Sequence, residues 1–245
     1  MGGDPGAPSA PSERYGPLVH RSVRHGAILY IVGVIEFIVG MVVTQLGYSG
    51  TTYSLTRNYI SDLGAYYCGV YHASVYPPNG IYVCSPLHEV FNVSIILMGL
   101  LLVVGTLLIR TGFPARATRS IGLGLLVIAG IGAIGVGLAP EDYNTTVHVI
   151  SAGIAFLLGN LALIVLALAM FRDTRWDGYR AYTLLSGVVG LIAFGLFYAG
   201  IWGPLGVGGM ERLIVAPLLL WALLAGIHLA RIPTFAPATM RGART

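Results

Sequence analysis

Six long apolar stretches restrict this chain of 245 residues to one class of fold. They cover approximately residues 27–47, 90–109, 120–139, 148–171, 181–202 and 213–230. About 20 residues of α-helix are long enough to cross a hydrocarbon core of ~30 Å. With 56% hydrophobic and only 10% charged residues, the composition excludes an ordinary soluble domain. We therefore predict an all-α membrane protein, a bundle of six transmembrane helices.

The basic residues predict the orientation of this bundle. All 14 are arginines, and basic residues in short loops stay on the cytoplasmic side during insertion. With a cytoplasmic N-terminus, twelve arginines lie inside and only Arg57 and Arg212 lie outside. An even number of spans places the C-terminus inside too. The same bias accounts for the net charge of +4, which therefore does not indicate nucleic-acid binding. We expect a multi-pass plasma-membrane protein, and the absence of lysine suggests a bacterium with a GC-rich genome.

Outside the spans, the chain divides into two tails and one long loop. Residues 1–19 are rich in Gly, Pro, Ala and Ser, which predicts a disordered cytoplasmic tail. A second cytoplasmic tail, residues 233–245, follows the transmembrane domain of residues 20–232. The outer loop, residues 48–87, is too long for a passive connection and suggests a functional cap. It holds both cysteines, Cys68 and Cys84, on the oxidising side, which favours a disulfide over two free buried thiols.

Polar residues from several segments converge at the outer ends of the predicted helices. Charged and polar groups near hydrocarbon are expensive unless they are paired or hydrated, so this convergence predicts a polar pocket that faces outwards. In the loop, residues 57–64 read as a short helix that carries three of these polar residues on one face. The candidate ligand-binding residues are Asn58, Ser61, Asp62, His88, Asn92, Glu141 and His148.

Some of these polar groups also have a structural interpretation. Asp142 or Asn144 can cap the helix that follows them, because their side chains accept free amide hydrogens. Glu211 and Arg212 are adjacent and point in different directions along a helix, so each needs a partner elsewhere. The natural pairs are Arg212 with Asp62 and Glu211 with Arg57, which predicts an ion-pair network of Arg57, Asp62, Glu211 and Arg212.

Four motifs occur in order along the chain: Asn58-x-x-Ser61-Asp62-Leu63-Gly64, Ser85-Pro86 with Phe91-Asn92, Pro140-Glu141 followed by His148, and Gly209-x-Glu211-Arg212 with Trp221. Together they resemble the family of bacterial and archaeal membrane proteins called domain of unknown function 998, over roughly residues 25–230. The first and last motifs are the most specific. The resemblance implies a compact bundle of about six helices and brings no established activity. The segment between Asp62 and Pro86 is longer than the family leads us to expect.

Three functions remain open at this point. In the first, the outer pocket binds a lipid headgroup, a small ligand or another membrane subunit without chemistry. In the second, His88, His148 and Asp62 bind zinc, and zinc-bound water hydrolyses a lipid at the outer leaflet, although the spacing matches no known zinc motif. The third is transport, suggested only by Glu36 and Asn160 at mid-membrane depth. We favour binding, and we expect the imidazole of His148 to point into the bundle rather than towards lipid.

Overall fold

The computed structural model describes residues 16–72, 80–171 and 173–231. Within these residues, six helices are long and apolar enough to span a membrane, as the sequence predicts. They are α1 Gly16–Leu46, α2 His88–Ile109, α3 Ala117–Leu138, α4 Thr145–Ala169, α5 Tyr179–Tyr198 and α6 Gly206–Arg231. Short 3-10 turns lie between them: η2 Ser61–Gly64, η3 Arg110–Gly112, η4 Thr174–Trp176 and η5 Gly203–Leu205.

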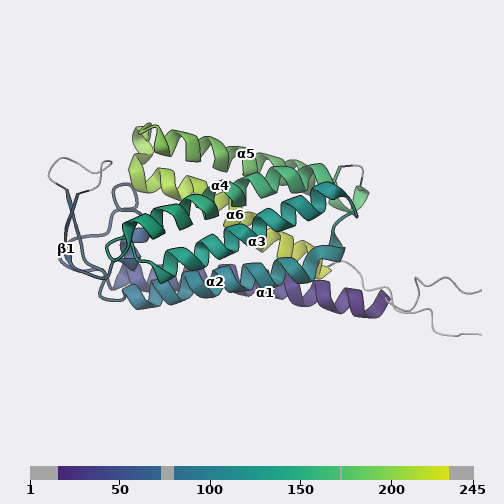
Figure 1. The fold of residues 1–245 in the computed structure, drawn as a ribbon, viewed down its shortest axis with the longest axis horizontal. Helices are drawn as coiled ribbons and strands as arrows, with labels where there is room; N and C mark the ends of the chain where they lie inside the picture. The colour runs from purple at the N-terminus through teal and green to yellow at the C-terminus, as the bar shows by residue number, and fades with distance from the viewer. Residues whose placement is uncertain (1–15, 73–79, 172, 232–245) are drawn as a thin grey trace, which may run out of the picture.

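The helices form a closed ring. Each packs against its neighbours along the chain, and α6 returns to pack against α1 (Figure 1). Small residues allow the helices to approach closely, as is common in membranes. At Gly132 on α3, for example, a Cβ atom would lie 2.8 Å from backbone atoms of both Ser151 and Ala155 on α4. The interior of the ring holds fully buried side chains such as Leu126 and Trp221.

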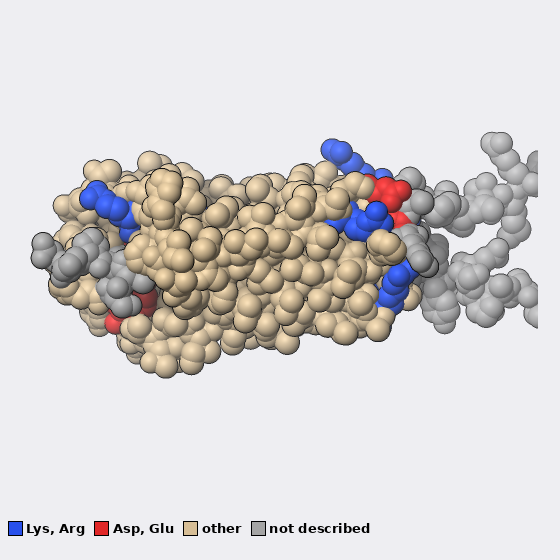
Figure 2. Space-filling model, turned by 90° about the horizontal axis from the view of Figure 1, so that it is seen from above, with Lys and Arg blue, Asp and Glu red and all other residues tan. Residues whose placement is uncertain are grey.

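The surface of the bundle is that of a membrane protein. On the face shown in Figure 2, charged side chains gather at the two ends and leave the middle free of charge. Large apolar side chains such as Val39 and Ile131 are exposed along the helices. A band of this kind is stable in contact with lipid tails and would aggregate in water. The chain is therefore a multi-pass membrane protein.

A small β-hairpin stands at one end of the bundle, which we call the hairpin end. Strands β1 (Gly69–Tyr71) and β2 (Ile81–Val83) pair in antiparallel register, with Val70 opposite Tyr82. A disulfide between Cys68 and Cys84 joins the two strands at their base, with 4.2 Å between the Cα atoms, so the predicted bridge is confirmed. The start of α1 and the end of α6 lie at the opposite end of the bundle (Figure 1).

The predicted tails fall largely outside the described residues. Residues 1–15 and 232–245 are not among them, and α1 begins at Gly16, before the predicted end of the N-terminal tail. With an even number of spans, both described ends of the chain reach the same end of the bundle. Their cytoplasmic location remains a prediction from the arginines.

Candidate functional site

The loop after α1 folds over the hairpin end of the ring and buries its own polar side chains. The carboxylate of Asp62 accepts hydrogen bonds from the Asn58 side chain at 2.7 Å and from the Tyr59 amide at 3.1 Å. The Asn58 side-chain oxygen, Oδ1, accepts in turn from the Ser54 amide at 2.9 Å. These side chains satisfy backbone groups that a helix would otherwise use. The predicted short helix over residues 57–64 is therefore reduced to the turn η2 at Ser61–Gly64.

Ser61 and Glu141 connect this loop to the segment between α3 and α4. The Ser61 hydroxyl donates to the Glu141 carboxyl at 2.6 Å, although the two residues are 80 positions apart in sequence. Burial and the neighbouring Asp62 carboxylate raise the pKa of Glu141 well above its usual range. Two neighbouring buried carboxyl groups share one proton more readily than they both ionise. The structure therefore brings three predicted site residues, Ser61, Asp62 and Glu141, into contact.

Glu211 and Arg212 at the start of α6 hold the loop through its backbone. The Glu211 carboxylate accepts from the Ile60 amide. The Arg212 guanidinium donates to the carbonyls of Leu55 at 3.1 Å, Asn58 at 3.0 Å and Gly208 at 2.8 Å. It also donates to the Tyr53 hydroxyl and lies over the aromatic ring of Tyr53, 5.5 Å from the ring centroid.

These contacts correct the predicted ion-pair network. Among the described residues, backbone groups and Tyr53 take the places that we assigned to Asp62 and Arg57 as partners of Arg212 and Glu211. Arg57 instead is exposed to solvent. The physical reason is that the turn directs several carbonyl oxygens at one point. A planar guanidinium with five donors satisfies such a group better than a single carboxylate does.

Asp142 and Asn144 divide the roles that the sequence left open. Asn144 caps α4, because its side chain accepts from the Val147 amide at 3.2 Å. Asp142 instead anchors the base of the hairpin. Its carboxylate accepts from the amides of Tyr66 at 3.0 Å and Tyr67 at 2.7 Å, and from the Tyr71 hydroxyl at 2.7 Å. Burial opposes the ionisation of Asp142, but these hydrogen bonds outweigh it and lower its pKa.

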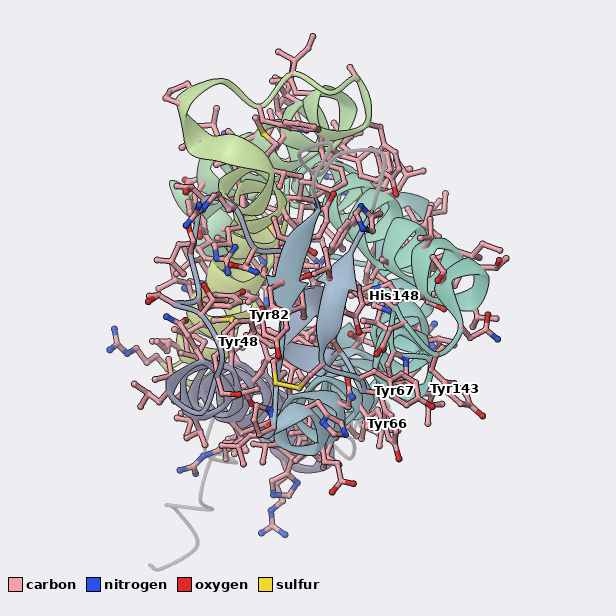
Figure 3. The ribbon with its side chains drawn as sticks, turned by 90° about the vertical axis from the view of Figure 1, so that its left-hand side faces the viewer. Tyr48, Tyr66, Tyr67, Tyr82, Tyr143 and His148 are labelled. Atoms are coloured by element: carbon pink, nitrogen blue, oxygen red, sulfur yellow. A yellow bond between two sulfur atoms is a disulfide. The ribbon has the colours of Figure 1, made fainter. Side chains whose placement is uncertain are left out.

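His88 and Asn92 lie in a separate groove on the surface of the hairpin end. This groove also contains Tyr66 and Tyr143, which lie on the same side of the bundle in Figure 3. The His88 Nδ1 atom lies 2.9 Å from the Ser85 carbonyl, and its ring packs against Tyr66 at 4.9 Å. Asn92 donates to the Gly64 carbonyl at 3.0 Å. Both residues thus brace the cap from the surface groove and do not line the internal cavity.

His148 is buried in the bundle, one turn into α4. Its Nδ1 atom donates to the Ala139 carbonyl at 2.8 Å, since a carbonyl can only accept. His148 therefore does not share the surface groove with His88. Among the described residues, no three His, Cys, Asp or Glu side chains are arranged to hold a metal ion. The predicted zinc ligands His88, His148 and Asp62 are thus not assembled into one site.

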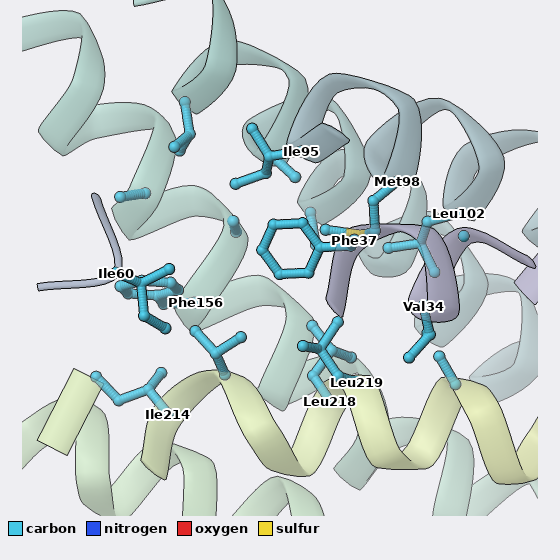
Figure 4. Close-up of a pocket in the computed structure, with 18 of the residues that line it drawn as sticks. Val34, Phe37, Ile60, Ile95, Met98, Leu102, Phe156, Ile214, Leu218 and Leu219 are labelled. Atoms are coloured by element: carbon cyan, nitrogen blue, oxygen red, sulfur yellow. The ribbon is translucent and has the colours of Figure 1, made fainter. Parts of the chain in front are cut away.

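An elongated cavity lies inside the ring, beneath the loop (Figure 4). Three polar residues line its hairpin end: Ser61, His148 and Glu211. From there it runs past apolar side chains such as Phe37 and Phe156 to Ala222. The volume of the cavity is about 80 Å³, whereas ~10–15 Å³ is enough for one water molecule. The ring thus encloses a space with a polar head and a mostly apolar body, in which Tyr30 and Asn160 are the remaining polar residues of the lining.

Comparison with known proteins gives a family and no function. Residues 31–228 match the family described as a protein of unknown function, DUF998. The chain belongs to this family. No curated protein and no solved structure matches it. The match covers all six spans in whole or in part, and the resemblance seen in the sequence motifs is confirmed.

Two features of this DUF998 site were not predicted from the sequence. One is Tyr53, whose hydroxyl joins Arg212 to the Tyr59 carbonyl; its only signal was an aromatic residue within a polar loop. The other is the apolar lining of the cavity. The sequence cannot show this lining, because apolar residues that face the cavity have the same character as those that face lipid. The polar residues at mid-membrane depth serve helix contacts. Glu36 accepts from Ser94 of α2, and Asn160 donates to the Ile214 carbonyl of α6.

Proposed function

We propose that this protein binds a single-chain amphiphile inside the bundle, with the apolar chain in the cavity and the polar end beside Ser61, His148 and Glu211. The observation that carries the proposal is the cavity itself, in which Ser61, His148 and Glu211 gather at the hairpin end, while Tyr30 and Asn160 are the polar residues further along a mostly apolar wall. A packing defect between apolar helices would have no such polarity. We place the protein in the plasma membrane with the hairpin end outside, on the distribution of its arginines.

The length of the cavity supports a lipid-like ligand. Glu211 and Ala222 on α6 both line it, and eleven residues of α-helix rise about 16 Å. This is roughly half of a ~30 Å hydrocarbon core, the depth of one leaflet. The cavity is therefore about as long as an acyl chain that reaches through one leaflet. Moving such a chain from lipid into the cavity costs little free energy, because the walls of the cavity are mostly apolar too.

The test is to fill the cavity with a larger side chain. Val34 on α1 lines the cavity and is buried, whereas Val39 on the same helix is exposed towards lipid. We expect Val34→Phe to abolish binding of a fluorescent dodecyl probe to the purified protein and to remove co-purified lipid from its native mass spectrum. The control Val39→Phe makes the same exchange outside the cavity and should bind the probe normally. Equal binding by the two variants would show that the ligand lies elsewhere.

Hydrolysis of a bound lipid is a second candidate, favoured by one contact. The Ser61 hydroxyl donates to the Glu141 carboxyl at the roof of the cavity, and a carboxylate in that position can take the proton of a nucleophile or of water. We do not propose a zinc-dependent form, since the described residues assemble no metal site. Release of dodecanoate from a dodecanoyl ester by the wild type, lost in Ser61→Ala, would support catalysis. If the ester stays intact, hydrolysis is refuted and binding is the remaining function.

A further inference from the structure

We propose that the polar end of the bound amphiphile is a protonated primary amine. This inference rests on the proposed function and specifies the ligand class. The three polar side chains at the head of the cavity, Ser61, His148 and Glu211, all offer acceptors to whatever lies there. A ligand that matches them must bring donors.

Each acceptor follows from a contact that is already made. Ser61 gives its hydroxyl hydrogen to Glu141, so its oxygen lone pairs remain. His148 gives the hydrogen on Nδ1 to Ala139, so the neutral ring keeps a lone pair on Nε2. Glu211 is only 6% exposed, and one of its oxygens accepts from the Ile60 amide while the carboxylate faces the cavity. An alkylammonium group carries three N–H donors and no acceptor, as a lysine head does.

The charges around this head also favour a cation. Glu211 brings a carboxylate to this head, and the nearby positive charge that acts on it is that of Arg212. Its guanidinium is already engaged by three backbone carbonyls and Tyr53. An ammonium group would offset the charge of the Glu211 carboxylate in a buried place, where an uncompensated charge is costly. A carboxylate or phosphate head would be repelled there, and a hydroxyl would satisfy one acceptor out of three.

Three probes that share one chain and differ in the head test this inference. Purified protein in phosphatidylcholine nanodiscs is titrated with dodecylamine, dodecanol and dodecanoate, each competing with a fluorescent dodecyl probe, and empty nanodiscs supply the blank. We expect dodecylamine to bind at least about tenfold more tightly than dodecanol, since a hydrogen bond to a charged group contributes enough for a factor of this size. Dodecanoate should bind most weakly.

A pair of variants assigns the preference to Glu211. We expect Glu211→Gln to bring the affinities for dodecylamine and dodecanol within about threefold of each other. The matched exchange Glu89→Gln, at an exposed carboxylate of the hairpin end, should keep the wild-type ratio. The ranking of the three probes on the wild type needs no variant, so it decides the question even if Glu211→Gln does not fold.

The outcomes separate this inference from the function on which it rests. If no probe competes, amphiphile binding itself is refuted. If the three probes bind with similar affinity, or dodecanoate binds best, the cavity takes amphiphiles but the amine is refuted. A preference for dodecylamine that persists unchanged in Glu211→Gln would overturn the assignment to this carboxylate.

Discussion

Replacing Arg212 with alanine should loosen the loop that covers the cavity. The guanidinium donates to three carbonyls and to the Tyr53 hydroxyl, and two of these carbonyls belong to the loop, at Leu55 and Asn58. Alanine removes the guanidinium donor from all four acceptors. The loop would then be held to α6 by the Glu211 contact with the Ile60 amide and by the hydrogen bond from the Gly208 amide to the Thr56 carbonyl at 2.9 Å.

The size of the loss follows from the burial of each contact. A hydrogen bond to a charged group contributes ~1.5–3 kcal/mol when water cannot replace it. The contact with Leu55 is exposed, and the other three are partly buried. Taking about 1 kcal/mol for each partly buried contact, because water replaces part of it, gives a loss of about 3 kcal/mol. For a chain of this size, that corresponds to a fall of roughly 6–12 °C in the midpoint of thermal unfolding.

The assay is thermal unfolding in detergent micelles, followed by tryptophan fluorescence, with two matched variants. Arg57→Ala removes an exposed arginine of the same loop and should shift the midpoint by less than about 2 °C. Arg212→Lys keeps the charge, but a compact ammonium cannot reach several carbonyls in fork geometry, so we expect an intermediate loss. The reasoning is refuted if Arg212→Ala and Arg57→Ala unfold at the same temperature.

Three further predictions concern packing, the cap and orientation. Gly190→Ala places a Cβ against the Asn160 side chain and should cost ~1–3 kcal/mol in unfolding free energy, whereas Gly195→Ala, with nothing within 4 Å, should not; equal midpoints would contradict this contact. Because the folded-state pKa of Asp142 is lowered, its contribution should be present above pH ~4 and be lost as the pH falls further. Faster amide exchange at Tyr66 and Tyr67 in Asp142→Asn at pH 7 would show the role of this carboxylate, and unchanged exchange would exclude it. Single cysteines introduced at positions 115 and 175 should react with an impermeant thiol reagent only from the cytoplasmic side, and labelling of both from outside would reverse the orientation.

Much of the polar site could be predicted from the sequence, but not its partners. Ser61, Asp62 and Glu141 stood out because charged and polar groups are rare in a chain like this and have to be satisfied where they occur. Arg212 was expected to pair with a carboxylate and pairs with carbonyls instead, because the turn of the loop directs these oxygens at one point. His88 and His148 look alike in the sequence, yet one lies in a surface groove and the other lines the internal cavity.

The sequence by itself determined the six spans, the disulfide of Cys68 with Cys84 and the family, because length, hydropathy and local motifs carry that information. Only the tertiary structure decided that the helices close into a ring around a cavity. In a soluble protein, the pattern of apolar residues shows which face of a helix is buried. In a membrane, the lipid and the interior are both apolar, so Val34 in the cavity wall and Val39 on the lipid face carry the same signal. Which of them lines the cavity is fixed by the contact of α6 with α1, which closes the ring.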